Sequence, residues 1–249
     1  MENRGQITIF IIIAITIISM SSLIYFVYPK IKTTLSTSDP VYTYLKECVE
    51  DAILSSAQIF GYQQGYYTLP SRTLKTNSSN IAYYYFDGEV HIPGNNFFEN
   101  ELAKIINERI VEECTNFLFF EEDGYLIEFE NPDTRIEIFE ETFNARVNFP
   151  VTAVYGNDAS RFSDFIYNPQ IRIGYIIETS RRLVEKIRGD PSAIDLTFFL
   201  NQDVDISISE YDNCNQVYII TDPKSRGWLQ EEYYAFAFAV KINDQYCKV

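Results

Sequence analysis

The chain has 249 residues and a formal net charge of −15, with 35 acidic side chains, 20 basic ones and one histidine. Apolar residues make up 46 % of it, which excludes a chain disordered by composition. The acidic balance excludes a typical nucleic-acid binder, because phosphate contacts need clustered Lys and Arg. A single histidine excludes zinc sites built on two imidazoles, and we find no P-loop, GxGxxG, CxxC or GxSxG motif. The sequence therefore predicts no cofactor and names no reaction.

Residues 7–28 form a run of 22 residues without a charged side chain. At about 1.5 Å per residue, a helix of that length spans the roughly 30 Å hydrocarbon core of a bilayer. We therefore expect a single-pass membrane protein that contacts lipid through residues 7–28. Basic residues flank the run on both sides, so the positive-inside rule gives no orientation. The acidic remainder, its four cysteines and the glycosylation sequon at Asn77 favour a C-terminal domain outside the cell membrane.

The hydrophobic segment has three alternative fates: an uncleaved anchor, a signal peptide cut near the small residues 19–21, or the leader of a pilin-type subunit. Arg4-Gly5-Gln6-Ile7-Thr8 resembles the class III signal peptide of archaeal type IV pilin-like proteins. This resemblance implies cleavage between Gly5 and Gln6 by a prepilin-type peptidase. It also implies that the hydrophobic helix stays on the mature subunit, where it can form the core of a filament.

A polar stretch separates the hydrophobic segment from the rest of the chain. Pro29 disfavours a continuous helix, and residues 33–40 are rich in cap and turn residues. This favours a simple tether over a rigid filament helix. The expected division of the chain is a short cytoplasmic leader (1–6), a transmembrane helix (7–28), a stalk (29–39) and one extracytoplasmic domain (40–249).

The layout also resembles a recurrent group of uncharacterised archaeal membrane-anchored surface proteins. The residues that carry this likeness are Arg4–Phe10, Tyr44–Cys48 and Gly61–Tyr66. The resemblance implies a location and no chemistry.

Within residues 40–249 the spacing of apolar residues predicts three helices, at 40–60, 99–119 and 169–188. Asp39 and Pro40 suit the cap and first position of the first helix. A short fourth helix is expected after Asp190-Pro191, where the same cap-then-proline pattern recurs.

Strands are predicted between the helices. Asp87-Gly88 and residues 131–134 each predict a hairpin, and Pro150 predicts a sheet edge or a bulge. The predicted strands are 81–86, 89–92, 125–130, 135–140, 143–154, 204–209, 216–221 and 233–242. Together these elements predict an α+β fold with a mainly antiparallel sheet and two to four helices.

The four cysteines lie too far apart for a paired zinc knuckle. An even number of cysteines in an outside compartment favours disulfides. Of the three connectivities, we prefer Cys48–Cys114 and Cys214–Cys247, because each joins elements that we expect to be neighbours. Four buried free thiols are the alternative.

Asp205, Ser207 and Ser209 form a D-x-S-x-S pattern like that of integrin-type Mg²⁺ sites, and they are the candidate metal ligands. The residues between them are Ile206 and Ile208. Such alternation is also typical of a half-buried strand whose polar residues face water, and we favour that interpretation.

Acidic pairs raise the hypothesis of a hydrolase, because two carboxylates held about 5 to 10 Å apart can hydrolyse glycosidic bonds. In a chain this acidic, such pairs are more often solvated faces. They are Glu112-Glu113, Glu121-Glu122-Asp123, Glu140-Glu141 and Glu231-Glu232. His91 is a candidate general base without a visible nucleophile, and the tyrosine clusters around Tyr66, Tyr84 and Tyr234 suit either packing or recognition.

The sequence favours a membrane-tethered cell-surface protein of non-enzymatic role. It would self-associate or bind another surface protein. The first alternative is a subunit of a type IV pilin-like filament, and the second is an anchored hydrolase that acts on surface polymers.

Overall fold

The structure is a computed structural model that describes residues 39–77, 79–191, 195–226, 233–243 and 247. The predicted leader, the hydrophobic segment 7–28, the processing residues Gly5 and Gln6, and nearly all of the predicted stalk lie outside the described residues. No helix in the described part of the chain is both long enough and apolar enough to cross a bilayer.

The first helix, α2 (Pro40–Tyr62), begins as its sequence predicts. The Asp39 side chain accepts a hydrogen bond of 2.9 Å from the Val41 amide, and Pro40 occupies the first turn, where its missing N–H costs nothing. Val41, Leu45 and residues further along the same face are buried. This apolar face makes α2 the central helix of the molecule.

The predicted helix 99–119 is wrong at both ends. The structure has α3 (Asn95–Glu113) and a separate single turn, α4 (Leu118–Glu122). Between α3 and α4, side-chain hydrogen bonds replace helical ones. Thr115 donates to the Val111 carbonyl at 2.7 Å, and the Asn116 side chain accepts from the Leu118 amide at 3.4 Å. Such local side-chain bonds compete with helical ones and end the helix.

The third long helix, α5 (Ile173–Gly189), starts four residues later than predicted. The Pro169 carbonyl instead accepts a hydrogen bond of 2.7 Å from the Thr142 hydroxyl, which holds this segment against the preceding sheet. The short helix α6 (Leu196–Leu200) is capped by Asp195 rather than by Asp190.

One mixed sheet has six strands in the order β1-β2-β10-β9-β8, with β3 beside β2. The pair β2–β10 is parallel and the others are antiparallel, so the sheet is mainly antiparallel. On β10 the predicted alternation is confirmed, with Tyr234, Phe236 and Phe238 buried. The strands are β1 (Thr73–Lys75), β2 (Asn80–Phe86), β3 (Glu89–Val90), β8 (Asp205–Glu210), β9 (Asn215–Arg226) and β10 (Tyr233–Lys241).

The second sheet is built around one long strand, β6 (Phe143–Tyr155). β7 (Asp158–Tyr167) pairs along one side of it, while β4 (Tyr125–Phe129) and β5 (Asp133–Ile138) follow each other along the other side. The predicted hairpin between residues 125–130 and 135–140 is therefore wrong, because each strand pairs with β6 instead. Pro150 lies at a shift of register in β6, which confirms the predicted bulge.

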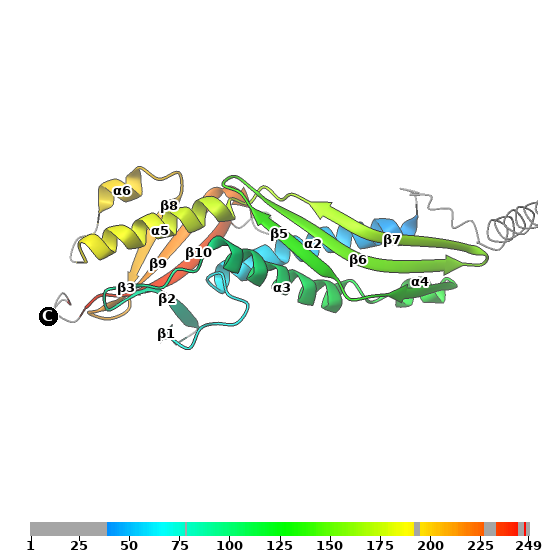
Figure 1. The fold of residues 1–249 in the computed structure, drawn as a ribbon, viewed down its shortest axis with the longest axis horizontal. Helices are drawn as coiled ribbons and strands as arrows, with labels where there is room; N and C mark the ends of the chain where they lie inside the picture. The colour runs from blue at the N-terminus through cyan, green and yellow to red at the C-terminus, as the bar shows by residue number, and fades with distance from the viewer. Residues whose placement is uncertain (1–38, 78, 192–194, 227–232, 244–246, 248–249) are drawn as a thin grey trace, which may run out of the picture.

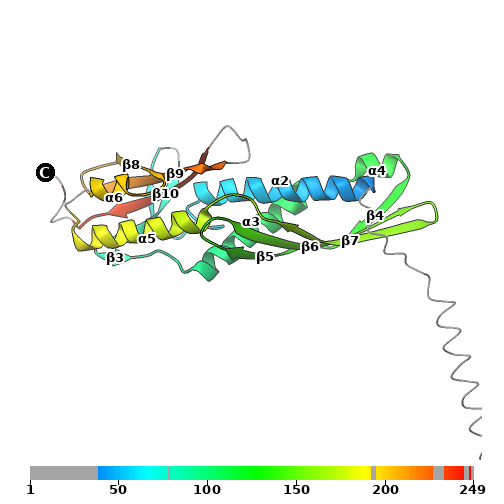
Figure 2. The ribbon, with the colours of Figure 1, turned by 90° about the horizontal axis from the view of Figure 1, so that it is seen from above.

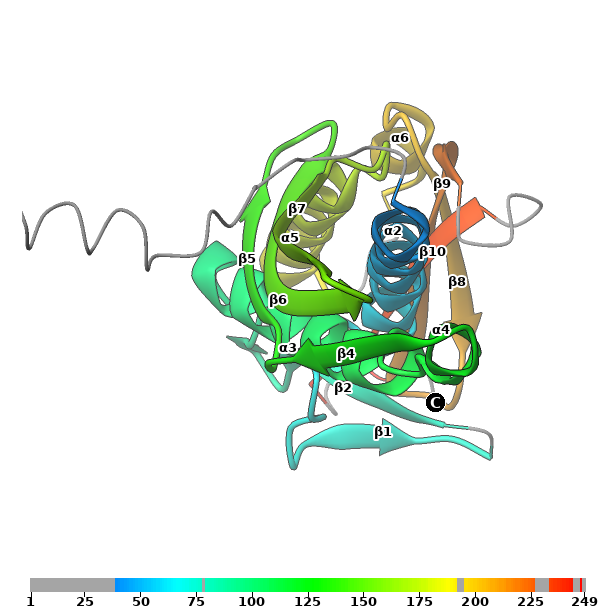
Figure 3. The same cartoon turned by 90° about the vertical axis from the view of Figure 1, so that its right-hand side faces the viewer.

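The molecule is elongated, and α2 runs along it between the two sheets (Figures 1 and 3). It packs on α3, on β7 near its start and on β10 near its end. Where α2 meets β10, a Cβ on Gly61 would lie 2.3 Å from the Ala235 carbonyl oxygen, so glycine permits the close approach. α5 and α6 lie at one end of the molecule, and α4 with the start of α2 lies at the other (Figures 1 and 2).

Candidate functional site

The predicted metal ligands lie on a regular strand. Asp205, Ser207 and Ser209 are exposed on β8, while Ile206 and Ile208 are half-buried and pack against the core. The whole of β8 pairs with β9, so these oxygens do not converge as they would on a loop. In the described ranges no group of three His, Cys, Asp or Glu residues is arranged to hold a metal ion.

The acidic pairs lie on separate elements, and their described members are exposed. Glu112 and Glu113 end α3 and both pair with Arg109. The other described groups are Glu121-Glu122-Asp123, which ends α4, and Glu140-Glu141, which follows β5. Glu231-Glu232 lies outside the described residues.

The two other candidates from the sequence lie on the surface of the six-stranded sheet. His91 is half-exposed beside Arg72, with 3.2 Å between its Nε2 and the arginine Nη1. Asn77 is exposed in the turn between β1 and β2.

The cysteines form the two preferred disulfides. Cys48 on α2 joins Cys114 at the end of α3, with 5.7 Å between their Cα atoms. Cys214, in the turn between β8 and β9, joins Cys247 after β10, with a Cα separation of 4.8 Å. The first disulfide locks the two central helices together, and the second holds the C-terminal end against the six-stranded sheet.

A buried ionic cluster at the start of α5 has no counterpart in the sequence analysis. Arg172 is 4 % exposed and donates to both carboxylate oxygens of Asp222, with 2.9 Å between Nε and Oδ2. It also donates to the Asp203 side chain at 2.9 Å and to the Asp203 carbonyl at 2.8 Å. Ser225 accepts from the Arg172 amide and donates to Asp222. The Tyr175 ring lies under the guanidinium at 4.8 Å.

The charges in this cluster stabilise one another. The hydrogen bonds that Arg172 donates to Asp222 raise the pKa of Arg172. Burial acts to raise the pKa of Asp222, but hydrogen bonds from Arg172, Ser225 and the Lys224 amide hold that pKa below its ordinary value. Every polar group of the cluster is therefore engaged with another, which is typical of a structural cluster rather than a reactive one. No sequence motif indicates it, because the partners of Arg172 lie 31 to 53 residues from it along the chain.

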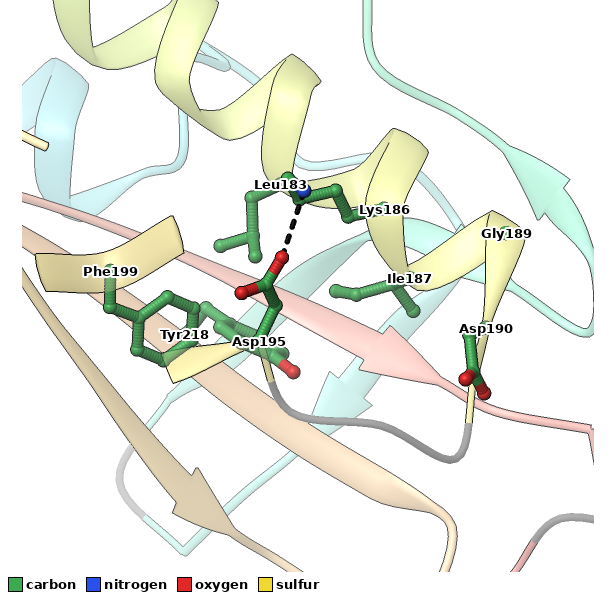
Figure 4. Close-up of a pocket in the computed structure, with 8 residues that line it drawn as sticks. All are labelled: Leu183, Lys186, Ile187, Gly189, Asp190, Asp195, Phe199 and Tyr218. Carbon is green, nitrogen blue, oxygen red and sulfur yellow. Dashed lines mark hydrogen bonds and ion pairs between the residues drawn. The ribbon is translucent and has the colours of Figure 1, made fainter. Parts of the chain in front are cut away.

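A pocket of about 370 Å³ opens beside the last turns of α5, away from this cluster, between α5, α6 and β9 (Figure 4). Its wall combines apolar and charged side chains, and an ion pair of 2.8 Å between Lys186 and Asp195 crosses it. The lining residues are Leu183, Lys186, Ile187, Gly189, Asp190, Asp195, Phe199 and Tyr218.

The polar groups of this pocket are already partnered. The hydrogen bond from Lys186 lowers the pKa of Asp195, which also accepts the amide of Phe198 as the cap of α6. Burial raises the pKa of Tyr218 to about 12, and its hydroxyl donates to Gln216 at 2.9 Å. The pocket therefore offers apolar surface and one ion pair, and among its lining residues no nucleophile is paired with a free base.

Exposed apolar side chains gather at the opposite end of the molecule. We call this set the apolar end, and it consists of four side chains that are 55 to 72 % exposed. Two lie on α4, one on β4 and one at the tip of β6, and they are Leu118, Phe119, Leu126 and Tyr155. This set could not be identified from the sequence, because its members become neighbours only when α4 folds beside β4.

No protein-family model, curated protein or solved structure matches the chain.

Proposed function

We propose that this protein is a single-pass, membrane-tethered surface protein whose disulfide-bonded α+β domain is displayed outside the cell. Its role is structural or interactive rather than enzymatic. The charge-free run 7–28 is the anchor. The chain that follows it enters the domain at the start of α2.

The observation that carries the proposed location is the pairing of all four cysteines. Both pairs are within bonding geometry, and each joins two different parts of the fold. Disulfides of this kind persist outside the cytosol and are rare in it. The formal charge of −15 supports the same side, since an acidic domain has no attraction to an anionic cytoplasmic leaflet.

The proposed non-enzymatic role rests on the state of the candidate reactive groups. Arg172 and Asp222 neutralise each other in the core, and Lys186 and Asp195 do so at the pocket. The acidic pairs that raised the hydrolase hypothesis lie in solvent on separate elements, so they offer no support for that alternative.

An alkaline wash of membranes from cells that express the full chain tests the anchor. We expect the protein to stay in the pellet, because a spanning helix is not released when surface charges are stripped. Replacing Ile13 and Ile17 by Lys should move it to the supernatant, since each lysine at the centre of a spanning helix costs about 2.5–3.5 kcal/mol. Ile166→Lys, on an exposed position of β7, is the matched control and should stay in the pellet. Release of the wild-type chain would refute the anchor.

A second candidate function is a pilin-like filament subunit, and the specific observation in its favour is Arg4-Gly5-Gln6. The intact mass of the protein from native membranes distinguishes the two. A chain that begins at Gln6 supports pilin-type processing and directs the search to filaments. A chain that keeps Met1 contradicts it and leaves the plain anchor.

A further inference from the structure

The apolar end surrounds the point at which the chain enters the domain. Asp39 and Pro40 begin α2 there, next to α4 and the start of β4 (Figures 1 and 2). Phe119 is 70 % exposed and Leu126 is 72 % exposed. Large apolar side chains that are exposed together often mark an interaction site.

Aromatic packing fixes these exposed residues in place. Tyr44 of α2 contacts the rings of Phe117 and Phe120 at 6.0 and 5.4 Å, and its hydroxyl donates to the Asn116 carbonyl at 3.4 Å. Phe120 in turn contacts Tyr125 at 5.9 Å. The single turn of α4 is therefore held between α2 and β4, with Phe120 buried and its neighbour Phe119 directed outward.

The tip of the second sheet continues this surface. Tyr125 contacts Tyr155 with 4.8 Å between ring centroids, and the two residues are paired across β4 and β6. Leu126 follows Tyr125 on the strand and is exposed on its other side. Aromatic and aliphatic side chains thus lie on both sides of the sheet tip, around the start of α2.

The length of the connecting chain limits how far this end of the domain can lie from the membrane. Residues 29–39 lie between the charge-free run and α2, and eleven residues reach at most about 40 Å when fully extended. The start of α2, and with it the apolar end, therefore stays within about 40 Å of the bilayer. Aromatic side chains are enriched at the membrane–water interface, where an apolar ring and a polar tip are both accommodated.

We propose that the apolar end docks on the lipid–water interface of the membrane that holds residues 7–28, so that the domain stands on the bilayer rather than swinging on its tether. This inference rests on the proposed function, since it requires the anchor. Glu121, Glu122 and Asp123 follow Phe119 and are exposed at the same end, so the surface fits neutral or zwitterionic headgroups and is repelled by anionic ones.

The test uses the full chain reconstituted into phosphatidylcholine vesicles, with tryptophan as the probe. Trp228, the single tryptophan of the chain, is first replaced by Phe. Each probe variant then carries one tryptophan. Phe119→Trp places the probe on α4, and Leu200→Trp, at an 86 % exposed site on α6 at the opposite end, is the matched control. Both sites are exposed, so neither substitution disturbs the core.

Bromine atoms on the lipid acyl chains should reduce the emission of the Phe119→Trp protein about twofold, since docked side chains reach about 5–10 Å into the headgroup boundary. Emission from the Leu200→Trp protein should not change. Vesicles rich in phosphatidylglycerol should give weaker quenching at low salt than phosphatidylcholine vesicles do. Equal, negligible quenching at both sites would overturn the proposal.

Flotation of the same samples on a density gradient separates this inference from the proposed function. Protein that does not float with the vesicles refutes the anchor and the docking together. Protein that floats without quenching at residue 119 refutes docking and leaves the anchor intact. A blue-shifted but unquenched tryptophan at residue 119 means that a second copy of the chain covers the apolar end, which also overturns lipid docking.

Discussion

Arg172 connects three parts of the fold through one side chain. It lies at the start of α5 and reaches Asp222 on β9 and Asp203 in the segment before β8. Asp222 is fully buried, whereas the side chain of Asp203 is 52 % exposed. The two aspartates therefore contribute differently, although both bond to the same guanidinium.

Asp222→Asn should lower the free energy of unfolding by about 3–5 kcal/mol, because it leaves the charge of Arg172 buried without its main partner. Asp203→Asn is the matched control and should cost much less, since water can solvate what remains. Urea unfolding of the detergent-solubilised full chain, followed by circular dichroism, measures both. Equal effects of the two substitutions would show that burial does not set the cost.

The same cluster predicts a dependence of stability on pH. The pKa of Asp222 is lower in the folded protein than in the unfolded chain, where it is about 3.9. Its contribution is therefore fully present above that value and is lost as pH falls through the folded pKa. We expect the unfolding free energy to fall between about pH 5 and pH 2, and to fall less steeply in Asp222→Asn. An identical slope in the variant would contradict this assignment.

Among the elements, α2 approaches β10 closely because the residue at their contact, Gly61, has no side chain. At Gly61 the helix approaches β10 so closely that an added Cβ would lie 2.3 Å from a backbone oxygen. Gly61→Ala should destabilise the protein by about 1–3 kcal/mol through overpacking. Gly189→Ala, at the end of α5 where a Cβ meets nothing within 4 Å, should be neutral or slightly stabilising. Thermal unfolding of the two variants provides the comparison, and a neutral Gly61→Ala would refute the close crossing.

The disulfide between α2 and the end of α3 should also contribute to stability. Replacing Cys48 and Cys114 by Ala opens a loop of 66 residues and should cost about 4 kcal/mol in the chain-entropy model. The corresponding change at Cys214 and Cys247 opens a loop of 33 residues and should cost somewhat less. Denaturant unfolding under non-reducing conditions tests the order, and a larger loss at the second disulfide would contradict it.

Local sequence patterns predicted most of the helices and strands. They failed where the position of a strand depends on which other strand it pairs with. The cap at Asp39 and the alternation on β10 are properties of neighbouring residues, so they could be predicted. The predicted turn at residues 131–134 does not form, because Asp133 already belongs to β5 and β4 and β5 run in the same direction along β6. Local sequence does not say that the two strands pair with β6 instead of each other. The strand β7 was missed for the same reason, since its burial depends on β6 and α2.

At the scale of the whole molecule, the two ends differ in chemistry. One end holds the pocket beside the last turns of α5, and the other is the apolar end beside the start of α2 (Figure 1). Neither feature was predictable from spacing, because each collects residues from elements that are distant in the sequence. The charge-free run and the cysteine count were readable directly, because composition alone carries them.

The central claim is that the domain lies outside a membrane that the N-terminal run anchors. Labelling of lysines in intact cells by a membrane-impermeant amine reagent tests it most directly. Lys46 and Lys104 have side chains that are 56 and 58 % exposed, so they react readily if the reagent reaches them. A cytoplasmic protein of the same cells reports that the membrane is sealed. The account predicts equal labelling of both lysines before and after lysis, and labelling that requires lysis would contradict it.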